Sequence, residues 1–318
     1  MNTEIKQDFS YPKEEIDLRE ILFALGQRKL WILSITLLFL VTSIIFSLFL
    51  PDIYRSQTIL KPAQQDETSG SPINAVSGLA NLAGVNIPST SFATNTKVAI
   101  ETMKAFSFFE KSFMPQIQLE NLMAYDSWDP INNSNSYDQN IYDSSSSKWV
   151  RTISFPKKQV PSAQEAHKEF LDHHLAIEED IETGLVTVSI DHKSAVIAKK
   201  WLEILIKQIN FVMREEKKYL SNKSIDFLTQ QIAITRYTEI KEALANVVQR
   251  ETEKLMLAEV DENYVFHTID PPYAPEEKAK PVRILIALLS LIIGAILACS
   301  YVLLSYFNNK TAYKKFKH

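Results

Sequence analysis

Two long apolar runs without a single charged residue constrain this chain more than any other feature of its sequence. The first spans residues 30–50 and the second spans residues 284–307. At about 1.5 Å per helical residue, each run is long enough to cross the ~30 Å hydrocarbon core of a bilayer. A helix buried in a soluble core rarely lacks charge on every face over such a length. The sequence therefore predicts two transmembrane helices, one near each end.

The residues around the first run indicate a retained anchor and not a cleaved signal peptide. About 29 residues precede it, and several of them are acidic, such as Glu14 and Asp17. Residues 51–54, which follow it, offer no small-x-small cleavage pattern. A secretory signal has a basic start, a shorter apolar region and small residues at its cleavage site.

Basic residues beside the two runs predict the orientation of the chain. Arg28 and Lys29 precede the first run, and four lysines follow the second: Lys310, Lys314, Lys315 and Lys317. Cytoplasmic flanks of membrane helices carry an excess of such residues. Basic residues on the other flank of the second run, such as Arg283, weaken the bias there. We expect residues 1–29 and 308–318 in the cytoplasm, and residues 51–283 on the other side of the membrane.

Small residues recur at four-residue spacing in the second run, at Ser290, Gly294 and Ala298. Small residues at this spacing let two membrane helices approach closely, although they are also common in membrane helices that pack differently. The first run carries Ser43 and Ser47 at the same spacing. The two runs are therefore candidates for packing against each other.

The stretch 194–260 contains neither proline nor glycine and has apolar residues at helical spacing, for example Ile197, Trp201 and Leu205. As one helix, its roughly 67 residues would reach ~100 Å. A rod of that length must pack against copies of itself or remain exposed, which favours a homo-oligomer. The alternative is two helices that fold back on each other near Ser221 and Asn222.

The rest of the outer region has mixed signals that predict an α+β base, made of residues 51–193 and 261–283. Residues 54–60 and 185–190 have the pattern of strands, and residues 64–95 have the composition of a loop. A helix is expected over 96–114, with its buried candidates Val98, Phe106, Phe109 and Phe113, and Pro115 should end it. Ser162 and Glu165 form a capping box for another helix.

Four prolines precede the second apolar run, at Pro271, Pro272, Pro275 and Pro281. Proline fixes the backbone in a conformation close to the polyproline helix. Residues 268–281 are therefore predicted to form a stiff, extended connector to the membrane.

No catalytic, cofactor-binding or metal-binding residues can be recognised in the sequence. The chain has six glycines and none of them forms a phosphate-binding loop, and Cys299 lies inside the second apolar run. The spacing of His167, His173 and His174 does not match that of metal ligands on a helix, so these histidines are interpreted as part of a solvated helix face, whereas His192 follows the strand at 185–190. A net charge of −4 argues against a nucleic-acid partner.

The order of these features resembles the polysaccharide co-polymerases, or Wzz-type O-antigen chain-length determinants. The resemblance covers nearly the whole chain. It rests on several segments in order: Ile16-Asp17-Leu18-Arg19, Pro51-Asp52-Ile53-Tyr54, Lys148-Trp149-Val150-Arg151, the strand after Gly184, Ala198-Lys199-Lys200-Trp201, Lys254-Leu255-Met256-Leu257-Ala258, Tyr264-Val265-Phe266 and the proline run. The tail after Phe307 is too short for a kinase, which resembles the family type that serves lipopolysaccharide O-antigen.

The resemblance implies a two-pass protein of the bacterial inner membrane with a periplasmic α+β base and a very long projecting helix. It implies a ring of identical subunits that works with membrane lipids, a separate O-antigen polymerase and a polysaccharide or lipid-linked glycan. It also implies no catalytic residues and no cofactor, so the expected function is non-enzymatic control of polymer length.

Other interpretations stay open from the residues alone. A regulator of capsule or exopolysaccharide length, an adaptor in an export machine, a periplasmic ligand sensor and a glycan-acting enzyme share parts of this layout. The short cytoplasmic segments argue against a sensor, because they leave no domain to receive a signal.

Overall fold

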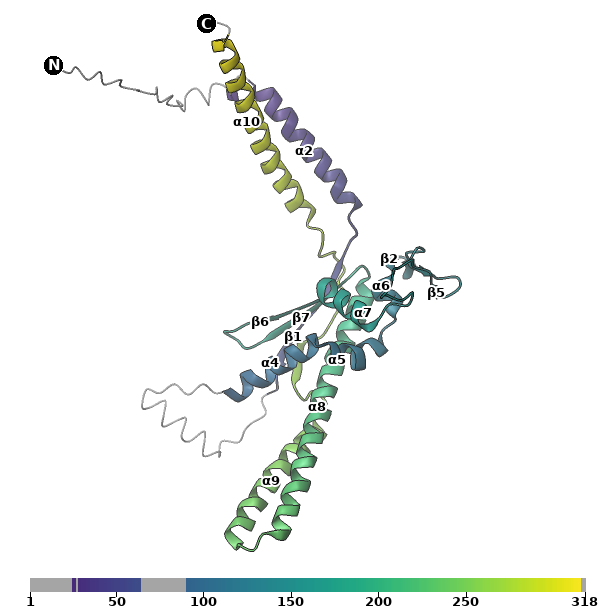
Figure 1. The fold of residues 1–318 in the computed structure, drawn as a ribbon, viewed down its shortest axis with the longest axis vertical. Helices are drawn as coiled ribbons and strands as arrows, with labels where there is room; N and C mark the ends of the chain where they lie inside the picture. Colours follow the sequence, from purple (N-terminus) through teal and green to yellow (C-terminus); the bar gives the residue numbers. More distant parts are fainter. Residues whose placement is uncertain (1–24, 27, 64–89, 316–318) are drawn as a thin grey trace, which may run out of the picture. The chain divides into compact units, whose positions relative to one another are not determined.

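The computed structural model describes residues 25–26, 28–63 and 90–315, with the backbone alone at 90–94 and 306–315. The chain divides into two compact units (Figure 1): Met1–Pro51 with Lys280–His318, and Asp52–Ala279. The expectations for Ile16-Asp17-Leu18-Arg19, for residues 64–89 and for Lys317 fall outside the described residues.

The first unit contains two antiparallel helices, α2 (Lys29–Phe49) and α10 (Arg283–Lys315). Both are long and apolar enough to cross a membrane, over Lys29–Phe49 and Arg283–Ser305, which confirms the two apolar helices predicted from the sequence. The Arg28 guanidinium donates a hydrogen bond to Ser305 Oγ over 3.2 Å, and Ser43 Oγ donates to the Ile286 carbonyl over 3.4 Å. The α10 helix continues to Lys315, through most of the segment expected as a tail.

The second unit is built on a four-stranded antiparallel sheet with the order β6-β7-β1-β8. The strands are β1 (Tyr54–Pro62), β6 (Leu175–Glu179), β7 (Val186–His192) and β8 (Phe266–Asp270). The two strands predicted from the sequence, 54–60 and 185–190, are the central pair β1 and β7. Alternate residues of β7, including Val188 and Ile190, are fully buried, as the period of a strand requires.

The buried face of β1 carries Ser56, Thr58 and Leu60, so two polar side chains lie in the interior. Buried hydroxyls need partners. Ser56 Oγ donates to the Tyr273 carbonyl over 2.7 Å, and Thr58 Oγ1 donates to the Asp270 carbonyl. These bonds hold the returning chain along β1.

The prediction that the connector begins at Thr268 is wrong. Residues 268–270 pair with β1 as the end of β8, because β1 offers backbone and hydroxyl partners along this edge. Beyond Asp270 the chain has no regular element before α10 apart from a single bridge residue, Lys280. The Ala279 amide donates to the Ile53 carbonyl over 2.8 Å.

The helix predicted over 96–114 is interrupted. It consists of α4 (Thr90–Lys104), α5 (Phe106–Phe108), a π-helical turn (Phe109–Phe113) and a 3₁₀ turn (Met114–Gln116) that contains Pro115. Ala105 has an extended backbone, which redirects the chain so that Phe109 and Phe113 enter the core. Val98, expected to be buried, is 47% exposed.

The aromatic core lies beneath the sheet, around Trp201. The indole of Trp201 is 2% exposed, and the ring centroids of Phe113 and Phe170 lie 6.4 and 6.3 Å from it. Phe113 and Phe170 are themselves 4.6 Å apart. Rings at these separations pack favourably.

Shorter elements surround this core. They are α6 (Leu119–Met123), α7 (Ala163–Glu169), a second π-helical turn (Phe170–His174) and two small hairpins, β2–β3 (Tyr125–Asp129, Ser134–Tyr137) and β4–β5 (Tyr142–Asp143, Lys148–Trp149). The predicted cap of α7 is present, because Ser162 Oγ accepts from the Glu165 amide over 3.3 Å. The Glu165 carboxylate accepts from the Arg151 guanidinium over 2.7 Å, and this ion pair lowers the pKa of Glu165.

The expected long helix is present, but the prediction of one helix through 194–260 is wrong. The α8 helix (Ala195–Ile234) has 40 residues, or about 60 Å, and α9 (Thr238–Val260) returns beside it (Figure 1). The chain turns at residues 235–237 and not near Ser221, which lies inside α8. Ser221 Oγ donates to Glu251 over 3.2 Å, and Lys218 pairs with Glu259 at 2.8 Å. Folding back half-buries one apolar side of each helix, which a single rod would expose.

Candidate functional site

The four histidines singled out in the sequence occupy different environments in the fold. Within the described residues, no three His, Cys, Asp or Glu side chains come together in a way that could hold a metal ion. His173 is an exposed residue with a 4.0 Å contact to Glu169. His167 Nε2 donates to the Lys104 carbonyl over 2.8 Å.

The interpretation as a solvated helix face is wrong for His174, whose ring packs against Trp201 together with that of His192. Their ring centroids lie 5.4 and 4.9 Å from that of Trp201, and 5.6 Å from each other. The π-helical turn at Phe170–His174 rotates His174 towards the core. This histidine–tryptophan cluster (His174, His192, Trp201) joins residues from three elements, and sequence spacing gave no sign of it.

Hydrogen bonds fix the neutral tautomers of both rings. His174 Nδ1 lies 2.7 Å from the Asp191 carbonyl, which can only accept, so Nδ1 carries the proton. His192 Nδ1 accepts from the Ser194 amide over 2.9 Å, and Nε2 donates to the Asn121 carbonyl over 3.0 Å. Protonation of His192 at Nδ1 would break its bond with Ser194. Burial lowers the pKa of His174 to about 4 and that of His192 to about 3.

These pKa values predict a loss of stability in acid. The histidines of the unfolded chain take up protons near pH 6.5, whereas those of the native chain do not. The free energy of unfolding therefore has its full value above about pH 6.5 and falls as the pH drops towards 4. We expect each of the two histidines to contribute a loss of about 3 kcal/mol between pH 7 and pH 4. Melting temperatures of the full chain in lipid nanodiscs would measure it. His174→Asn should flatten the pH dependence, whereas the exposed control His173→Asn should not; equal slopes for both would contradict the assignment.

An ion pair between the central strands β1 and β7 stabilises the end of the sheet that carries His192. Arg55 and Asp191 are opposite each other in the β1–β7 register. The guanidinium donates from Nε to Oδ1 over 2.6 Å and from Nη2 to Oδ2 over 2.8 Å, while the Asp191 side chain is only 8% exposed. Such bidentate pairs of an arginine with a carboxylate have a fixed geometry. The hydrogen bond with Asp191 raises the pKa of Arg55.

The small residues of α10 lie at different depths. Gly294 and Ala298 are buried, and Ser290 Oγ donates to the Ala287 carbonyl of its own helix over 2.8 Å. A Cβ added at Gly294 would lie 2.9 Å from Phe39 Cβ and 3.3 Å from Thr36 Cα, so α2 and α10 approach closely at this glycine. A larger residue there would require the two helices to separate.

The prolines singled out from the sequence do not come together in a site. Pro271 and Pro272 follow β8 directly, and Pro275 is half-buried in the segment after Tyr273. Pro281 belongs to the other unit, two residues before α10 begins. Their positions fit a role in directing the backbone between β8 and α10 and not a role in binding.

The helical hairpin presents an apolar surface that the described part of the chain leaves uncovered. Leu220, Phe227 and Ile234 of α8 are 50%, 59% and 71% exposed. They are spaced by seven residues and therefore lie on one face of α8. This α8 stripe (Leu220, Phe227, Ile234) is separate from the face towards α9, where the half-buried Ile225, Leu228 and Ile232 follow Ser221 at helical spacing.

A stripe of this kind fits helix packing with another chain. Three large apolar side chains spaced by seven residues have the pattern of a helix–helix seam. Contiguous exposed apolar surface usually marks an interaction site. In the sequence, the seven-residue spacing of the stripe cannot be distinguished from the periodicity of the buried helical face.

Comparison with known proteins places this geometry in context. Residues 14–111 match the family described as "Wzz: Chain length determinant protein". A search of curated proteins found no match. The chain is similar to a solved full-length bacterial polysaccharide co-polymerase, with 13% identity, 94% of this chain and 99% of that chain covered, and a TM-score of 0.36.

A second solved structure is a fragment of WzzB, a polysaccharide co-polymerase from Salmonella Typhimurium. It is 13% identical and covers 72% of this chain and 100% of that one, with a TM-score of 0.25. The family match over residues 14–111 includes α2, β1 and α4, and over this part of the chain it confirms the Wzz-type resemblance seen in the sequence.

Proposed function

We propose that this protein is a non-enzymatic regulator of polysaccharide chain length, and that its polymer is lipopolysaccharide O-antigen. The observation that carries the proposal is the family match over residues 14–111. The two apolar helices and the long helical hairpin fit the same role, because they supply anchors and a projecting surface.

The proposed arrangement is a two-pass protein of the bacterial inner membrane. Both termini lie in the cytoplasm and residues 51–283 lie in the periplasm, as the basic residues beside α2 support. The base consists of residues 51–193 and 261–283, and the hairpin projects from it. A separate O-antigen polymerase would perform the chemistry on a lipid-linked glycan.

The protein acts as a homo-oligomer in this proposal. The α8 stripe supports it, since the stripe is apolar, exposed and spaced for helix packing. A ring of hairpins would then bind the growing polymer and bring copies of the polymerase together.

Gel separation of lipopolysaccharide from cells with and without the protein tests the function. We expect a cluster of long bands with the protein and a featureless ladder of mostly short chains without it. The capsule or exopolysaccharide of the same cells is sized in parallel. A change confined to that polymer would assign length control to another polysaccharide, and no change in either would contradict the proposed function.

A further inference from the structure

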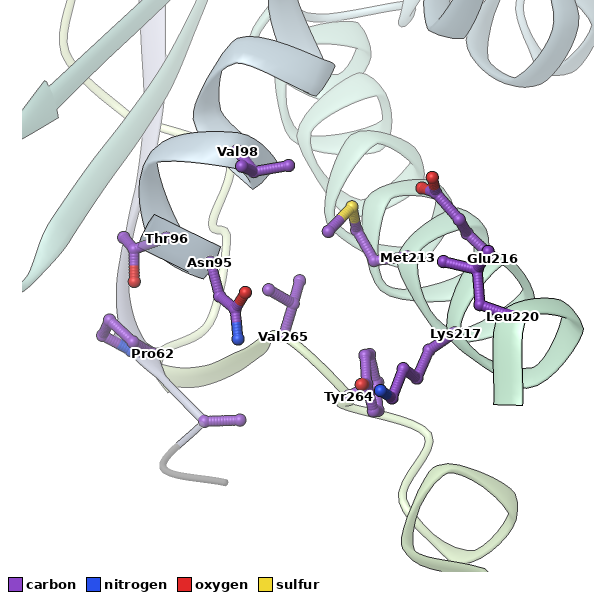
Figure 2. A pocket seen from close by; sticks show the side chains of 11 residues that line it. Pro62, Asn95, Thr96, Val98, Met213, Glu216, Lys217, Leu220, Tyr264 and Val265 are labelled. Carbon is purple, nitrogen blue, oxygen red and sulfur yellow. The ribbon is translucent and has the colours of Figure 1, made fainter. Parts of the chain in front are cut away.

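A surface cavity of about 230 Å³ lies between the end of β1, the start of α4, the middle of α8 and the segment before β8 (Figure 2). Its lining combines apolar and polar side chains from these four segments. The apolar ones include Val98, Met213 and Val265, and the polar ones include Asn95, Lys217 and Tyr264. All of these residues belong to the unit Asp52–Ala279.

The polar side chains converge from different elements. Figure 2 shows the Asn95 amide directed into the space between α4 and α8, while Lys217 extends from α8 towards Tyr264. Across the described ranges Lys217 forms no ion pair, whereas its neighbour Lys218 is held by Glu215 at 3.3 Å and by Glu259 at 2.8 Å. The Lys217 ammonium is therefore available to a ligand as a donor of up to three hydrogen bonds.

This mixture of groups fits the chemistry of a sugar ring. A pyranose has an apolar face of C–H groups that packs on aliphatic or aromatic side chains, and hydroxyls around its edge that bond to amide, ammonium and phenol groups. Ligand sites of this kind combine an apolar lining with a few placed polar groups. A cavity of about 230 Å³ has room for one pyranose ring and not for a long segment of polymer.

The rim of the cavity allows the ring to belong to a longer chain. Val98 is 47% exposed at its edge, whereas Val265 is buried inside. A sugar linked to the bound ring on the Val98 side can therefore continue into solvent, away from the α8 stripe. A closed cavity of the same lining would accept only a free monosaccharide.

We propose that this cavity binds one pyranose unit of the polysaccharide. The inference rests on the proposed function for the identity of the ligand, and it adds a specific site on each subunit. Asn95 and Lys217 bond to the ring hydroxyls, and the methyl groups of Met213 and Val265 contact the apolar face.

Saturation-transfer NMR tests the site with the full-length protein in lipid nanodiscs. The probe is an oligosaccharide of one to three repeats, prepared from the surface polysaccharide of the host cell. Saturation of the protein methyl protons should pass to the ring protons of the sugar, because Met213 and Val265 lie in the cavity. Lys217→Met and Asn95→Leu should each weaken binding about tenfold, since each removes a hydrogen bond to the ligand.

The matched controls are Lys223→Met and Asn222→Leu, which make the same chemical changes at exposed positions of α8 outside the cavity. They should bind the probe as the wild type does. Absence of transfer to the wild type, or equal weakening in cavity and control variants, would overturn the proposal.

The two proposals can fail separately. If the wild type controls chain length on the gel and gives no transfer to the probe, the cavity proposal is wrong and the proposed function stands. If removal of the protein leaves every polysaccharide unchanged in length, the proposed function is wrong whatever the NMR experiment shows.

Discussion

Replacing Trp201 with alanine is expected to lower the free energy of unfolding by about 3–5 kcal/mol. Trp201 is 2% exposed, and its ring contacts Phe113, Phe170, His174 and His192. Its removal takes away buried apolar area and leaves a cavity that surrounding elements cannot fill, because they are fixed by the sheet and by the hydrogen bonds of the histidines.

The measurement is the melting temperature of the full chain in lipid nanodiscs, followed by far-ultraviolet circular dichroism. For a unit of this size, the expected loss corresponds to a decrease of roughly 6–15 °C. The matched control is Trp149→Ala in the β4–β5 hairpin, where the indole is half-buried and packs on Tyr142 at 5.1 Å. We expect a much smaller decrease there. A Trp201→Ala protein that melts within about 2 °C of the wild type would contradict this description of the core.

The double variant Phe227→Asp, Ile234→Asp is expected to dissociate the oligomer. Burying a large apolar side chain contributes about 1.5–3 kcal/mol, and a carboxylate placed in the same interface would lose its hydration without gaining a partner. Because both side chains are exposed in the single chain, the fold of the hairpin should not change. The particle mass in detergent and the helical content report these two effects separately.

Asn222→Asp, Thr229→Asp is the matched control for the stripe. These two exposed residues are also seven apart on α8 and lie on another face of the helix. The control should keep the mass of the wild type. An unchanged mass in the stripe variant, or dissociation of both variants, would show that the α8 stripe is not the contact between subunits.

The sequence was sufficient for features that depend on local pattern. Uncharged runs of more than 20 residues predicted α2 and α10 because few other structures tolerate them. Alternation predicted β1 and β7, and the Ser162 cap was visible as a spaced pair of residues. Each of these signals is complete within one segment.

The errors arose where a distant segment decided the local structure. The turn at residues 235–237 has neither proline nor glycine, so only the pairing of α8 with α9 explains it. The helix breaks at Ala105 because the change of direction there lets Phe109 and Phe113 pack in the core. The connector forms β8 at its start because β1 presents a free edge and two buried hydroxyls.

The candidate surfaces were beyond prediction for the same reason. The histidine–tryptophan cluster joins residues from the π-helical turn Phe170–His174, β7 and α8, and the cavity collects Asn95, Lys217 and Tyr264 from three segments. Sequence spacing relates residues within one element, whereas these groups are related only through the fold. The α8 stripe differs, since its spacing is local but its exposure depends on which face α9 covers.

The measurement that tests the central claim most directly joins assembly to chain length in the same cells. The wild type, the stripe variant Phe227→Asp, Ile234→Asp and the control Asn222→Asp, Thr229→Asp are expressed at equal levels in cells that lack the native protein, and their lipopolysaccharide is separated on one gel. If the protein controls length as an oligomer, the wild type and the control give the cluster of long bands, and the stripe variant gives the ladder of cells without the protein. A stripe variant that is monomeric by mass and still gives the full cluster of long bands would contradict the account.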